Sequence, residues 1–121
     1  MCDEEEPKPK VSKERLVTIQ KLNDMLRRNW MGGEIVITQG ASELVGGALV
    51  GDVLYKMGNY DDFSSANDPY GEHDFGAFEE HGVKFFWKID YYNLAKDGHS
   101  PDPANPHVTC RVLTLMLASE Y

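Results

Sequence analysis

Cysteines and long apolar runs are both scarce in this chain of 121 residues. The two cysteines are Cys2, in a highly charged terminus, and Cys110, in an apolar segment, so we expect no disulfide and a reducing compartment. No secretory signal is recognisable, and no apolar run reaches the roughly 20 residues that a membrane-spanning helix needs. The sequence therefore predicts a cytoplasmic protein without a membrane association.

Basic side chains are scarce after residue 30. Residues 31–121 contain fourteen acidic and five basic side chains, and the whole chain has a net charge of -8. Binding to duplex DNA requires the opposite sign of charge, because it depends on the release of cations from the phosphates. The composition argues against direct duplex-DNA binding and favours a partner protein with a basic surface.

The first thirty residues divide into a tail and a helix. Residues 1–10, MCDEEEPKPK, are charged and contain prolines, which predicts a disordered tail. Apolar residues then recur every third or fourth position, which predicts an amphipathic helix over 12–31 that Ser12 caps. Its solvent face is expected to carry the basic residues Lys13, Arg15, Lys21, Arg27 and Arg28.

Two β-prone segments, 74–79 and 83–92, are separated by a turn and predict a β-hairpin. If His81 and Gly82 form its loop, Glu79 pairs with Lys84, an opposite-charge pair that supports this register. The same register pairs Ala77 with Phe86 and Phe75 with Lys88. One face of the second strand, expected to face the core, then carries Phe85, Trp87, Ile89 and Tyr91.

The remaining segments complete an α+β fold. Residues 34–38 predict a short strand, and a helical period predicts a helix over 48–57. The apolar segment 106–119 predicts a buried third helix, with a β-strand as the rival interpretation. We therefore expect a single domain over 11–121, in which three helices pack on a small antiparallel sheet that contains the hairpin.

Four segments together resemble a known family: NDPYGEHDFG, WKIDYY, SPDPANP and RVLTLMLASEY. The chain is similar, over about residues 15–121, to a small bacterial family known as domain of unknown function family 3768, whose mark is HDFG, here His73–Gly76. The resemblance implies an origin in proteobacterial genomes or plasmids. It implies no activity, cofactor or catalytic residue.

Acidic and aromatic residues gather around this motif. Continuing the hairpin register places His73 opposite Asp90, either as a structural pair that braces the loop 67–71 or as a general base with its orienting carboxylate. We expect Asp74 to accept backbone N–H groups of the preceding loop, with a site carboxylate as the alternative. The candidate binding residues are Asp61, Asp62, Asp68, Tyr70, Glu72, His73, Lys88, Asp90 and Tyr92.

Two function classes remain open. The first is an acidic accessory protein that binds a macromolecule, for example as an inhibitor or nucleic-acid mimic carried on a mobile element. The alternative is a small hydrolytic or metal-dependent enzyme that uses His73, Asp74 and Asp90. We expect neither a cofactor nor a metal site, because three consecutive residues of a strand cannot all face one point and no paired-histidine spacing occurs.

Overall fold

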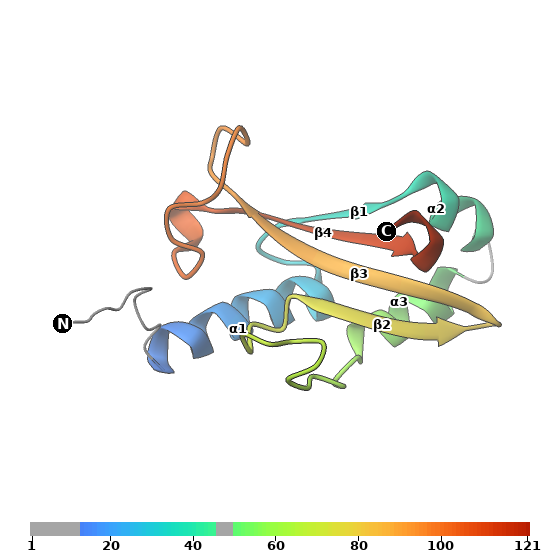
Figure 1. Ribbon diagram of the computed structural model, residues 1–121. Helices are drawn as coiled ribbons and strands as arrows, with labels where there is room; N and C mark the ends of the chain where they lie inside the picture. The colour runs from blue at the N-terminus through green and yellow to red at the C-terminus, as the bar shows by residue number, and fades with distance from the viewer. Residues whose placement is uncertain (1–12, 46–49) are drawn as a thin grey trace.

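A mixed sheet of four strands, in the order β1-β4-β3-β2, organises the fold (Figure 1). The computed structural model describes residues 13–45 and 50–121. The tail 1–10, the predicted cap Ser12 and the start of the predicted helix 48–57 lie outside these residues. In chain order the elements are α1 (Lys13–Asn29), β1 (Glu34–Ile37), α2 (Gln39–Val45), α3 (Val50–Gly58), β2 (Phe75–Glu80), β3 (Val83–Tyr92), η2 (Pro106–Val108), β4 (Cys110–Leu117) and η3 (Ala118–Glu120).

The predicted hairpin is confirmed as β2 and β3, including its register. Phe75 pairs with Lys88 and Glu79 pairs with Lys84. The two loop residues His81 and Gly82 have φ angles of 53° and 78°. Two consecutive positive φ angles are typical of the type I′ turn, whose twist matches that of the flanking strands.

One face of the sheet packs against α1 and α3, and this interface forms the core. Burial alternates along β3, so that every second residue from Phe85 to Tyr91 is buried. Trp87 is fully buried and lies over Gly76 of the neighbouring strand, where a Cβ atom would overlap the indole ring. Glycine is therefore required at this position by close packing. The helices contribute Ile19 and Leu26 from α1 and Val53 and Met57 from α3.

The predicted helix over 106–119 is wrong, because this segment forms β4 between two short 3₁₀ helices. β4 lies inside the sheet, antiparallel to β3 and parallel to β1, so the sheet is mixed and not purely antiparallel. Leu113 and Leu115 face the core, while Met116 on the opposite face is also buried. Apolar residues on both faces gave the segment the all-round apolar pattern of a buried helix.

The other predicted elements are confirmed in part. Helix α1, strand β1 and helix α3 match the predicted segments closely, whereas α2 was not predicted. Within the described part of the chain, no helix has the length and hydropathy needed to cross a membrane. A single domain over 11–121 stays a prediction.

Candidate functional site

His73 lies just before β2 and does not contact Asp90. Its backbone has a φ of 59°, which turns the chain away from the strand and directs the imidazole towards α1. There its Nδ1 atom is 3.1 Å from Asp24 Oδ1. The ring stacks on Phe63 with a centroid distance of 4.0 Å. Asp90 instead accepts a hydrogen bond of 2.6 Å from Lys88 Nζ, so the predicted His73–Asp90 pair is wrong.

Asp24 joins this histidine to a buried arginine. Arg27 is fully buried and donates to Asp24 Oδ1 at 2.9 Å and to the backbone oxygen of Tyr60 at 3.1 Å. Its guanidinium lies over the rings of Phe63 and Trp87. Burial lowers the pKa of Arg27, and Asp24 opposes that effect. The prediction of Arg27 on the solvent face of the helix is therefore wrong.

A second buried network connects α1 to the sheet. Asn23 is fully buried, donates to Tyr91 Oη at 2.8 Å and to the Glu72 backbone oxygen at 2.9 Å, and accepts from Arg111 Nε at 2.7 Å. Tyr91 in turn donates to Glu72 Oε1 at 2.8 Å. Burial, the largest influence, raises the pKa of Tyr91, so this phenol stays protonated. The network fixes the position of Glu72, a predicted site residue.

Asp68 supports the turn that precedes His73. Its carboxylate is buried and accepts the backbone N–H groups of Glu72 and His73, both at 3.0 Å. Asp68 thus has the role that the sequence had suggested for Asp74, whose carboxyl interacts with its own backbone N–H group. These two charge-assisted hydrogen bonds stabilise the negative charge of Asp68 in its buried position.

Asp74 lies in a surface hollow of about 500 Å³ between the loop before β2 and the outer face of the sheet. Burial raises the pKa of Asp74 to about 6, and the carboxylates of Glu72 and Asp68 add to the effect. A carboxyl group of this kind exchanges its proton close to neutral pH. We call this feature the Asp74 hollow; its lining includes Tyr70, Asp74, Phe75, Lys88, Asp90 and Tyr121.

The structure brings four of the predicted site residues together in the Asp74 hollow: Tyr70, Asp74, Lys88 and Asp90. Asp61 and Asp62 are exposed and line a separate hollow of about 520 Å³ beside α3 and β2. Tyr92 pairs with Cys110 and bridges to His99, and it is not among the residues that line these hollows.

Three polar residues of α1 and β4 were missed by sequence reasoning: Asn23, Asp24 and Arg111. The sequence carries a signal for Asn23 alone. Together with Arg27, it shares the inward side of the helix with the apolar residues Ile19 and Leu26. A polar residue on such a face usually has a buried hydrogen-bond partner.

The fold and site together define a small α+β protein in which the segment HDFG leads into the edge strand β2. Comparison with family models then gives its membership: the model described as "Protein of unknown function (DUF3768)" matches residues 37–120, which is more than half of the chain, and the chain belongs to this family. The family membership stated from the sequence is thereby confirmed over residues 37–120, whereas the HDFG mark and the bacterial origin stay predictions. No curated protein and no solved structure matches the chain significantly.

Proposed function

We propose that this protein is a non-enzymatic binding protein that holds a basic segment of another protein in the Asp74 hollow. The observation that carries the proposal is that a partly buried acidic residue and two exposed tyrosines line the same hollow. Tyr70 and Tyr121 are 76% and 73% exposed, and both line the hollow with Asp74. Exposed tyrosines are enriched at protein interfaces, and their ring faces attract Arg and Lys side chains.

The electrostatics of the hollow favour a cationic ligand. Among the described residues Asp74 forms no ion pair, whereas Lys88 is bound to Asp90 and its pKa is raised by that hydrogen bond. The negative charge of an ionised Asp74 is therefore only partly neutralised by nearby positive charge at neutral pH. A guanidinium or ammonium group of a partner would supply the missing positive charge.

The charge of the whole chain supports a particular class of partner. Residues 31–121 have nine more acidic than basic side chains, and Asp61 and Asp62 are exposed near α3. A protein that binds nucleic acid presents a basic surface that such carboxylates fit. We infer a cytoplasmic accessory protein of a bacterium or plasmid that occupies the nucleic-acid site of its partner as an inhibitor or mimic.

One observation favours a second candidate, a small acid–base enzyme. Because the pKa of Asp74 is about 6, this carboxyl could accept or donate a proton at neutral pH. His73 and Asp90 would not share this chemistry directly, since His73 contacts Asp24 and Asp90 contacts Lys88. An enzyme would turn over a small molecule and lose turnover in Asp74→Asn, whereas a binding protein would lose its partner.

Affinity capture with matched variants tests the proposal. The immobilised full chain is compared with a hollow variant, Tyr70→Ser with Asp74→Asn, and with a control, Tyr55→Ser with Asp97→Asn. The control removes an equally exposed tyrosine and an exposed carboxylate outside the Asp74 hollow. Any captured protein is purified and its affinity is measured by calorimetry at low and high salt.

We expect the wild type and the control to capture the same basic protein and the hollow variant to lose it. The affinity should fall as salt rises, because the contact is partly ionic. Equal capture by both variants would contradict a role for the hollow. Salt-independent binding would contradict the role assigned to charge.

A further inference from the structure

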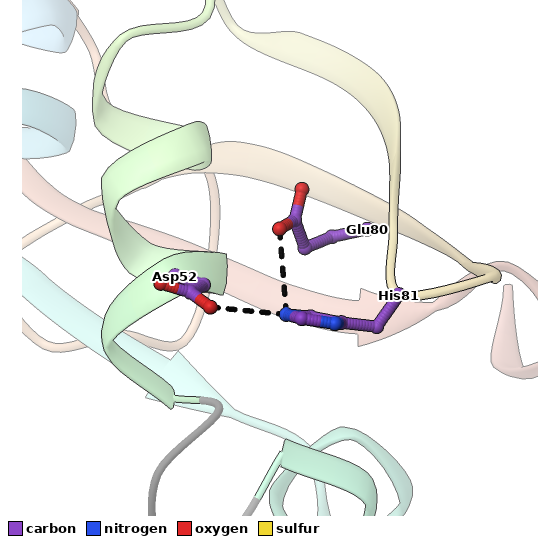
Figure 2. Close-up of side chains that lie close together, drawn as sticks. All are labelled: Asp52, Glu80 and His81. Atoms are coloured by element: carbon purple, nitrogen blue, oxygen red, sulfur yellow. Dashed lines mark hydrogen bonds and ion pairs between the residues drawn. The ribbon is translucent and has the colours of Figure 1, made fainter.

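A histidine and two carboxylates converge beside the hairpin turn, outside the Asp74 hollow (Figure 2). Asp52 lies in the first turn of α3, Glu80 ends β2, and His81 begins the turn. His81 Nε2 is 3.0 Å from Asp52 Oδ2 and 3.5 Å from Glu80 Oε2. Figure 2 shows both carboxylates directed at this one ring nitrogen.

The separations match those of ligands around one small cation. Zinc holds imidazole nitrogen and carboxylate oxygen at about 2.1 Å, so two ligands at a tetrahedral angle lie about 3.4 Å apart. The distances of 3.0 Å and 3.5 Å bracket this value. The three donor atoms all lie within 4.8 Å of one another, so small side-chain rotations would complete the set.

A hydrogen bond alone satisfies this arrangement incompletely. One imidazole nitrogen carries a single proton or a single lone pair, so it can donate well to only one of the two carboxylates. A cation at this point would contact all three groups and offset both negative charges. Lys56 Nζ lies 3.3 Å from Glu80 Oε1, while the second carboxylate oxygen, Oε2, is the one near His81. Lys56 thereby orients the Glu80 carboxylate, as residues outside the coordination sphere often orient a metal ligand.

We propose that Asp52, Glu80 and His81 bind a divalent transition-metal ion of the zinc class, which links the hairpin turn to α3. The imidazole favours zinc and its neighbours over magnesium or calcium, which prefer oxygen ligands. Three protein ligands leave a fourth position for water. The proposal departs from the sequence-based expectation of no metal site, because Asp52 joins the other two residues only through the packing of α3 beside β2.

Zinc titration of the full chain tests the site. All proteins carry Cys2→Ser, so that the terminal thiol cannot contribute a ligand. Binding of Zn²⁺ is measured by calorimetry, and the visible spectrum of Co²⁺ reports the coordination geometry. The test variant is His81→Asn, because asparagine tolerates the positive φ of 53° at this position. The control is His107→Asn, which removes an exposed histidine in η2.

We expect one equivalent of Zn²⁺ to bind to the parent protein and to the control. Loss of an outer-sphere partner alone costs about 10–100-fold in affinity, so loss of the ligand in His81→Asn should weaken binding by at least about tenfold. Unchanged circular dichroism of the variant would show that its fold is retained. Equal binding by His81→Asn and the control would overturn the proposal, as would the absence of binding to the parent protein.

Discussion

Asp74 provides a quantitative test of the electrostatics of the hollow. Its pKa is about 6 in the folded protein, against an ordinary value of 3.8, because burial and then the carboxylates of Glu72 and Asp68 disfavour the ionised form. The folded chain therefore holds this proton more tightly than the unfolded chain does. As pH rises from about 3.8 to about 6, this difference lowers the free energy of unfolding; above and below that window its contribution is constant.

The size of the effect follows from the two pKa values. Each tenfold difference in acidity corresponds to about 1.36 kcal/mol, so a pKa of about 6 in place of 3.8 gives an upper value of about 3 kcal/mol. Asp74 is only partly buried, and solvent screens a part of the interaction. We therefore expect about 1–2 kcal/mol of this destabilisation at pH 8 and little of it near pH 4.

Asp74→Asn should remove this pH dependence, because the amide has a similar shape and does not ionise. Urea unfolding of the wild type and the variant is measured at pH 4 and pH 8. The stability gained by the variant should be larger at pH 8 than at pH 4 by about 1–2 kcal/mol. Asp61→Asn, which changes an exposed carboxylate, is the matched control. If Asp74→Asn loses stability at pH 8, or changes equally at both pH values, the reasoning on the buried charge is refuted.

Three further predictions concern the core and the surface. Asn23→Ala should lower the free energy of unfolding by about 2–4 kcal/mol, because the buried partners of Asn23 lose their hydrogen bonds. Urea unfolding measures this loss. The control is Asn59→Ala at an exposed position, which should change the free energy of unfolding by under about 0.5 kcal/mol. Gly76→Ala should cost about 1–3 kcal/mol by forcing a methyl group against Trp87. Thermal unfolding should show a loss for Gly76→Ala and none for Gly51→Ala, which has open space on helix α3. A gel-shift titration with duplex DNA should give no complex, since the charge has the wrong sign, and a tight, salt-sensitive complex would contradict this.

The hairpin could be predicted from the sequence because all of its determinants are local. Side chains alternate along both strands, and a two-residue loop fixes the register once His81 and Gly82 are assigned to it. The pairing of Phe75 with Lys88 then follows by counting. β4 lacked such a local determinant, because a strand inside the sheet that is apolar on both faces has the same composition as a buried helix.

The surroundings of His73 could not be predicted because they depend on backbone geometry and on distant residues. The prediction extended the strand register back to His73 and so assumed that its backbone is extended. The positive φ of His73 instead keeps this residue out of β2, which begins at Phe75. Its partner Asp24 lies on α1, 49 residues earlier in the chain. Periodicity places residues on a helix face, but it does not show which loop packs against that face. The spacing of Asn23 and Arg27 from Ile19 and Leu26 was the one available signal of a buried polar contact, but Arg27 was assigned to the solvent face.

The four residues of HDFG serve different needs at one point of the fold. His73 contacts α1 and turns the chain into β2, and Gly76 leaves room for the indole of Trp87. Phe75 packs on the outer face of the sheet, opposite to both. Substitution of His73, Phe75 or Gly76 therefore changes packing or backbone geometry. A loss of activity in such a variant could not be distinguished from a loss of folding. Asp74 lines the hollow and its ionisation opposes stability. Asp74 therefore lowers stability at a place that a ligand could reach. Substitution of Asp74 should change function without loss of folding, so it separates the two best.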